Sequence, residues 1–195
     1  MHILALCGSL RTQSLNAALL RAICRLAPAT MQIHISDTIA ALPLFNPDLE
    51  DDAPPAVRLL RQQILAADAL LIASPEYAHG ITSVMKNALD WMVSSEDLVQ
   101  KPVVVLNASP RASHADLALR EVLSVMSAEI IDAASITVPI IGARLDEDGI
   151  VAHADIAASL TGAMKAVEVY WQLRGLNSAA NAADAGVVGG AAFPL

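Results

Sequence analysis

The sequence has few aromatic residues, few cysteines and few basic residues. Phe, Trp and Tyr make up 3% of the 195 residues, so alanine and branched aliphatic residues must build the core. The two cysteines, Cys7 and Cys24, form no CxxC pattern, which argues against a disulfide framework and a zinc site. A net charge of −8, with the 12 Lys and Arg residues scattered, argues against binding to nucleic acid.

Long apolar runs are also missing. No run approaches the roughly 20 apolar residues of a membrane span. The short N-terminal run lacks the basic start of a signal peptide. We therefore expect a cytoplasmic protein with no membrane and no nucleic-acid partner. Residues 1–174 are expected to form one domain, and the Ala- and Gly-rich tail, residues 175–195, to be poorly ordered.

Apolar stretches typical of strands alternate with stretches of helical periodicity. Strands are expected at residues 3–7, 31–36, 69–74, 102–107 and 130–138, and helices at 14–27, 54–67, 81–93, 114–128 and 154–173. This alternation predicts an α/β fold with a parallel sheet covered by helices on both faces. Residues 31–36 alternate apolar with polar, as an edge strand does. Gly149 and the acidic residues 146–148 are expected in a solvated turn.

A small polar loop, Gly-Ser-Leu-Arg-Thr-Gln-Ser at residues 8–14, joins the first expected strand to the first helix. Such a loop favours an anion, because backbone N–H groups and the positive end of the helix dipole point at it. It matches neither the three-glycine dinucleotide fingerprint nor the Walker A loop. Two interpretations remain: a seat for a flavin mononucleotide (FMN) phosphate, as in some doubly wound folds, or an N-cap serine without a ligand.

Further blocks follow the loop in a specific order. They are Leu-Pro-Leu-Phe-Asn-Pro-Asp at residues 42–48, Ser-Pro-Glu-Tyr at 74–77 and Val-Met-Lys-Asn-Ala-Leu-Asp-Trp at 84–91. With these blocks the chain resembles the NAD(P)H-dependent FMN reductase family, which includes chromate, quinone and azo-dye reductases. The resemblance extends from residue 1 to the early 170s. The fold expected is a flavodoxin-like doubly wound sheet of five parallel strands in the order 2-1-3-4-5.

This order would bring three loops to one edge of the sheet, because ligands in such folds bind at the carboxyl ends of the strands where the strand order reverses. The resemblance implies a non-covalent FMN site there. Its residues would be Ser9, Arg11, Ser14, Leu15 (through its backbone N–H), Asn16, Pro75, Glu76, Tyr77, Ala78 and Ser109. For Glu76, a role in fixing the loop or pairing across a subunit interface is favoured over acid–base chemistry.

The activity that the resemblance implies is hydride transfer from NADPH or NADH to FMN, followed by transfer of two electrons to a small acceptor. The acceptor would be a quinone, free flavin, an azo compound or a metal oxyanion. The cofactor carries this chemistry, so no side chain is assigned a catalytic role and no metal is expected. The resemblance also implies a homodimer or homotetramer, with Trp91 and Met92 either at the interface or in the core.

The chain departs from the family pattern at three places. Ala78 stands where members often have Asn, Thr82-Ser83 stands where they often have Pro-Gly, and the loop after the fourth strand, residues 109–114, contains no glycine. Arg111 in that loop is a candidate to bind the 2′-phosphate of NADPH or an anionic acceptor. Two alternatives therefore stay open: a flavodoxin-type electron carrier, and a family member that has lost FMN and plays a structural role. Cys7 is interpreted as a small buried apolar residue rather than a redox thiol.

Overall fold

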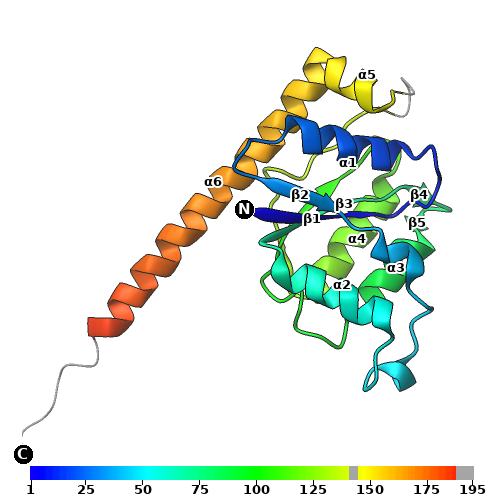
Figure 1. Cartoon of the computed structure of the whole chain (residues 1–195). Helices are drawn as coiled ribbons and strands as arrows, with labels where there is room; N and C mark the ends of the chain where they lie inside the picture. Colours follow the sequence, from blue (N-terminus) through cyan, green and yellow to red (C-terminus); the bar gives the residue numbers. More distant parts are fainter. Residues whose placement is uncertain (141–144, 188–195) are drawn as a thin grey trace, which may run out of the picture.

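A five-stranded parallel sheet forms the centre of the molecule (Figure 1). The computed structural model describes residues 1–140 and 145–187. The strands lie in the order β2-β1-β3-β6-β7, which confirms the predicted topology and the edge position of β2. Their bounds are His2–Cys7 for β1, Gln32–Ile35 for β2, Ala69–Ala73 for β3, Pro102–Leu106 for β6 and Glu129–Ile130 for β7.

Helices cover both faces of the sheet, as the alternating pattern predicted (Figure 1). Successive side chains of a strand point to opposite faces, so β1 contributes to two cores. Ile3 and Ala5 pack with helices α1 (Leu15–Leu26) and α6 (Ala154–Val187). Leu4 and Leu6 pack with α2 (Pro55–Ala66), α3 (Ser83–Asp90) and α4 (Ser113–Val125).

Trp91 and Met92 follow α3 and belong to the second of these cores. Their exposed fractions are 0% and 1%, and the indole N–H of Trp91 donates to the carbonyl of Pro43 at 2.8 Å. The ring of Phe45 stands edge-on to Trp91, with centroids 5.1 Å apart. Of the two interpretations of these residues, the core is therefore confirmed, and neither side chain is available to a partner subunit.

The last strand is shorter than predicted. The sequence predicted a strand over residues 130–138, but β7 ends at Ile130. A turn interrupts it, because the N–H of Ser135 donates to the carbonyl of Ile131 at 3.0 Å. Pairing resumes only at Thr137, which forms an isolated bridge with Asn107. The alternating apolar residues in this stretch therefore do not mark one continuous strand.

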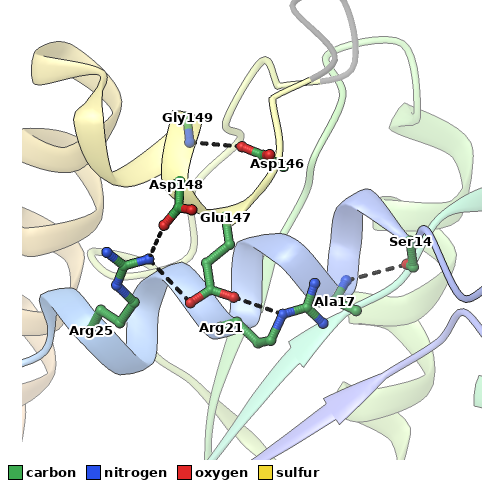
Figure 2. Close-up of polar contacts among 8 residues, drawn as sticks. All are labelled: Ser14, Ala17, Arg21, Arg25, Asp146, Glu147, Asp148 and Gly149. Carbon is green, nitrogen blue, oxygen red and sulfur yellow. Dashed lines mark hydrogen bonds and ion pairs between the residues drawn. The ribbon is translucent and has the colours of Figure 1, made fainter.

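The predicted turn around Gly149 is wrong, because these residues form helix α5, Glu147–Ala152. Asp146 caps it by accepting from the N–H of Gly149 at 2.9 Å. Glu147 accepts from Arg21 at 2.9 Å, and Asp148 accepts from Arg25 at 2.6 Å, so α5 is fastened to α1 (Figure 2). Acidic residues in the first turn of a helix also interact favourably with its dipole, which explains why this run is helical.

Helix α6 is longer than predicted. It was expected to end at Leu173 but continues to Val187, and its C-terminal part projects past the sheet (Figure 1). At 1.5 Å per residue its length is about 51 Å. Alanine has the highest helix propensity, and it outweighs Gly175 here. The rest of the predicted tail, residues 188–195, lies outside the described residues, and its poor order stays a prediction.

Candidate functional site

A cavity of about 330 Å³ lies at the carboxyl ends of β1, β3 and β6. This is the edge at which the strand order reverses and where ligands of doubly wound folds bind. Three loops line it, one after each of these strands. The lining residues are Ser9, Arg11, Gln13, Ser14, Leu15, Asn16, Ser74, Pro75, Glu76, Tyr77, Asn107, Ala108, Ser109, Arg111 and Ala112.

The loop after β1 presents the N-terminus of α1 to the cavity. Ser14 is the N-cap, and its hydroxyl accepts from the N–H of Ala17 at 3.2 Å. The backbone N–H groups of Leu15 and Asn16, in the first turn, donate to no other residue in the described part of the chain. These N–H groups and the helix dipole make this end of the cavity suited to an anion.

Asn16 is the buried polar residue at this helix end. Its side chain is 4% exposed, and its Oδ1 atom has no hydrogen-bond partner among the described residues. Most buried polar side chains have a partner, so an unpaired one at a cavity indicates a missing ligand group. The Oδ1 atom accepts, so it suits a ligand hydroxyl, whereas the amide N–H group of Asn16 can donate to a phosphate oxygen.

Gly8 allows the loop to pass very close to the end of β3. Its N–H donates to the carbonyl of Ala73 at 2.9 Å. A Cβ atom at position 8 would lie 2.2 Å from the hydroxyl oxygen of Ser74 and 2.6 Å from its Cβ. Only glycine fits this approach, and it brings the loops after β1 and β3 together at the cavity.

The loop after β3 folds into a small antiparallel hairpin of β4 (Glu76–Tyr77) and β5 (Gly80–Ile81). Its tip residues, Ala78 and His79, have positive φ angles of 50° and 59°. The carboxylate of Glu76 accepts from the N–H of Ala115 at 2.9 Å, which ties the hairpin to the first turn of α4. This contact agrees with the interpretation of Glu76 as a residue that fixes the loop.

The glycine-free loop after β6 is held by its own side chains. The amide of Asn107 donates to the carbonyl of Ala112 at 3.1 Å, and its Oδ1 accepts from the N–H of Ser109 at 3.0 Å. The hydroxyl of Ser109 accepts from the N–H of Arg111 at 3.2 Å. These bonds define the backbone of the loop without glycine, and they leave the guanidinium of Arg111 exposed at the cavity.

Cys7 lies at the end of β1, directly before the small polar loop of residues 8–14. Its thiol is 8% exposed and donates to the carbonyl of Ser9 at 3.5 Å. Burial raises the pKa of the thiol above its usual value, so the reactive thiolate is disfavoured. This environment suits a packing residue, as the sequence indicated.

The structure brings nearly all of the predicted site residues to this one cavity. Ser9, Arg11, Ser14, Leu15, Asn16, Pro75, Glu76, Tyr77 and Ser109 line it, whereas Ala78 lies at the hairpin tip, outside the lining. Sequence reasoning did not select Gln13, Ser74, Asn107, Ala108 or Ala112 as site residues. A polar residue directly after a buried strand, as at positions 74 and 107, was the signal that could have found two of them.

Residues 1–140 and 145–187 contain neither a metal-binding cluster nor a membrane-spanning helix. In that part of the chain no group of three or more His, Cys, Asp and Glu side chains is placed to hold a metal ion. Over the same residues, no helix has both the length and the apolar character needed to cross a membrane.

The fold and the cavity define a doubly wound α/β protein with a small polar loop and a helix N-terminus at its topological switch point. The profile of the NADPH-dependent FMN reductase family matches residues 1–142, and the chain belongs to this family. The family resemblance that the sequence blocks indicated is therefore confirmed.

Relatives with assigned names point the same way. The chain is 42% identical over 112 residues to an NAD(P)H-dependent FMN reductase of Pseudomonas aeruginosa, and 34% identical over 113 residues to a quinone reductase of Escherichia coli. Each match covers 56% of this chain and 60% of the relative, so the chain spans less than two thirds of either. A solved structure, the flavoenzyme NAD(P)H:(acceptor) oxidoreductase FerB of Paracoccus denitrificans, is similar with a TM-score of 0.67 and 27% identity, over 85% of this chain and 93% of that one.

Proposed function

We propose that the chain is an FMN-dependent oxidoreductase that takes a hydride from NADPH or NADH and passes two electrons to a small acceptor. The observation that carries this proposal is the buried carboxamide oxygen of Asn16, which lies at the switch-point cavity beside the N-terminus of α1 and has no hydrogen-bond partner among the described residues. The names of the relatives, FMN reductase and quinone reductase, support the reaction class. A quinone is the acceptor we favour.

The residues present fit FMN. In our proposal the phosphate lies against Ser9, Arg11, Ser14 and Asn16, and the N–H of Leu15 donates to it. The segment from Pro75 to Ala78, together with Ser109, approaches the flavin ring. All of these residues except Ala78 line the cavity, which supports this placement. When bound, FMN supplies the hydride and electron chemistry, and the protein contributes binding, orientation and exclusion of water.

The first test is whether the purified chain binds FMN at all. The protein is incubated with FMN, passed through gel filtration and examined by visible absorbance. Retained flavin absorbance that bleaches rapidly on mixing with NADPH supports the reductase. Retained flavin that NADPH does not reduce at a useful rate means an electron carrier, and no retained flavin means a protein that has lost the cofactor.

Two variants of Ser14 separate its structural role from its role toward the phosphate. Aspartate is as good an N-cap as serine, so Ser14→Asp should keep the free energy of unfolding within about 0.5 kcal/mol of wild type. Its carboxylate would repel a phosphate, so the Kd for FMN should rise at least about tenfold. Ser14→Ala should instead cost about 1 kcal/mol of stability. Urea unfolding of the apo-protein and FMN titration are the measurements, and wild-type affinity in Ser14→Asp would contradict the phosphate seat.

The family resemblance also leads us to propose a homodimer or homotetramer. Leu10 and Tyr77, on two of the loops that form the cavity, are 58% and 54% exposed, and such apolar side chains beside a cavity suit contact with a second subunit. Light scattering coupled to size-exclusion chromatography measures the mass directly. A monomer at micromolar concentration would contradict this proposal. The cytoplasmic location stays a prediction.

A further inference from the structure

The arginines of this chain divide into two groups by their partners. Most have guanidinium groups that bond to carboxylates or carbonyls: Arg21, Arg25, Arg58, Arg61, Arg120 and Arg174. Among the residues that the structure describes, Arg11 and Arg111 are the arginines whose guanidinium groups have no such partner. Both line the same cavity. Both side chains are therefore available to a ligand that enters this cavity.

The two arginines reach the cavity from different sides. Arg11 follows β1 and lies in the loop with the N-terminus of α1, whereas Arg111 follows β6. Strand β3 lies between β1 and β6. With neighbouring strands about 4.8 Å apart, the two strand ends are about 10 Å apart. Arg11 and Arg111 therefore enter the cavity on separate loops, and our assignment of the phosphate to Arg11 and the α1 N-terminus leaves Arg111 without a role.

The charge around Arg111 also favours an anion. Glu76 is the acidic residue of the cavity lining, and its carboxylate already accepts from the N–H of Ala115. The protein carries a net charge of −8, so a cavity with two unpaired arginines is a cationic site on an acidic molecule. Arginine binds phosphate, sulfonate and carboxylate groups in a two-bond geometry that few other side chains offer.

We propose that Arg111 forms a second anion subsite in this cavity, which binds an acidic group of the substrate that enters beside the flavin. This inference rests on the proposed function. The group that binds Arg111 is an anion with two or three oxygen atoms, and two ligands could carry it. One is the 2′-phosphate of NADPH, and the other is an acidic substituent of the acceptor. The hydrogen bonds within residues 107–112 hold the backbone of Arg111 in place for this role.

The experiment compares the FMN-loaded Arg111→Gln and Arg111→Lys variants with wild type. Lys165→Gln is the matched control: Lys165 is an exposed cation on α6, outside the cavity lining and without a partner among the described residues, and its removal changes the net charge equally. Steady-state kinetics are measured with NADPH and NADH, and with a neutral and a sulfonated naphthoquinone. Calorimetric titration with NADP⁺ and NAD⁺ gives a readout independent of turnover.

We expect Arg111→Gln to lower, by about tenfold, the preference for one anionic ligand over the matched ligand that lacks the anionic group. If the source is the nicotinamide nucleotide, the KM for NADPH and the Kd for NADP⁺ rise relative to those for NADH and NAD⁺. If the source is the acceptor, kcat/KM falls for the sulfonated quinone relative to the neutral one. Arg111→Lys should restore part of either loss, and Lys165→Gln should match wild type in every ratio.

Other outcomes overturn the inference. If the NADPH-to-NADH, NADP⁺-to-NAD⁺ and sulfonated-to-neutral quinone ratios of Arg111→Gln all equal those of wild type, the protein has no anion subsite at this position. The same loss for every substrate, or an equal loss in Lys165→Gln, means a general structural or long-range charge effect. These results differ from a failure of the proposed function, in which wild-type protein would itself retain no flavin or would not be reduced by NADPH.

Discussion

At the scale of single residues, the site depends on how closely two loops approach each other at Gly8. The loop after β1 must lie against Ser74 for the N-terminus of α1 to face the cavity. Because a Cβ at position 8 would overlap the Ser74 side chain, we expect Gly8→Ala to destabilise the protein by about 2 kcal/mol and to weaken FMN binding. Urea unfolding and FMN titration measure the two effects.

A second glycine provides the control for this prediction. Gly162 lies on the exposed side of α6, and a Cβ there would have no atom within 4 Å. Gly162→Ala should therefore stabilise the protein by about 0.5–1 kcal/mol, because alanine favours the helix. Adding Ser74→Gly to Gly8→Ala removes the overlapping side chain and should recover part of the lost stability. No recovery in the double variant would show that the clash is not the cause.

At the scale of elements, the hairpin β4–β5 shows a conflict between sequence and backbone. Ala78 and His79 both adopt left-handed conformations, which Asn and Gly tolerate much better. We expect Ala78→Asn to raise the free energy of unfolding by about 0.5–1 kcal/mol, since Asn accepts this conformation more readily. The Ala78 side chain is exposed and outside the cavity lining, so the gain would come from the backbone.

The matched comparison for the hairpin is the same substitution where the backbone is helical. Ala158 is an exposed residue of α6, and Ala158→Asn should lower stability by a few tenths of a kcal/mol or more. Changes of opposite sign in the free energy of unfolding at the two positions would support the assigned turn. A loss of stability at both would mean that the tip does not adopt the left-handed conformation in solution.

The same hairpin explains which elements the sequence could not predict. Strands β1, β3 and β6 were predictable because each is a short apolar run followed by a polar loop. The hairpin was not, because Ala-His is not a turn sequence, and the bond that ties the hairpin to α4, from Ala115 to Glu76, joins residues distant in sequence. Helix α5 was missed for a similar reason: its acidic first turn is stabilised by Arg21 and Arg25 of α1, which are distant in sequence.

More of the candidate site than of the structure around it could be predicted from the sequence. Small polar residues that directly follow buried strands are local signals, and the strand order brings them to one edge. The burial of Asn16, and the lack of a partner for Arg111 among the described residues, depend on how three loops pack, and no local pattern encodes them. The sequence therefore predicted where a ligand would lie but not which polar groups would be left for it.

At the scale of the whole molecule, helix α6 joins parts of the chain that are far apart in sequence. Arg174 of α6 donates to Glu129 in β7 at 3.1 Å and to the carbonyl of Gln100 at 3.0 Å. It also donates to the hydroxyl of Tyr170 at 2.9 Å. The outer end of the sheet is therefore fastened to α6 by a small polar cluster, and the ionisation of that cluster should affect the stability of the entire fold.

Tyr170 gives this cluster a pH dependence with a definite sign. Burial, together with a hydrogen bond to Glu129, raises the pKa of Tyr170 to about 12. Between pH values of about 10 and 12 the unfolded chain loses the phenol proton while the folded chain keeps it, so stability falls as the pH rises through this window. After a discount for the exposed part of the ring, we expect a loss of about 1 kcal/mol.

Comparison between variants isolates this effect from the other groups that titrate at high pH. Burial lowers the pKa of Lys101, so this group contributes the opposite slope, a gain in stability as the pH rises toward its usual value. Because Lys101 is unchanged in Tyr170→Phe, the difference between wild type and this variant reports Tyr170 alone. Urea midpoints should converge as the pH rises above about 10. Tyr77→Phe, at the exposed tyrosine, should instead follow the wild-type curve, and parallel curves for Tyr170→Phe and wild type would mean that the phenol is not coupled to the fold.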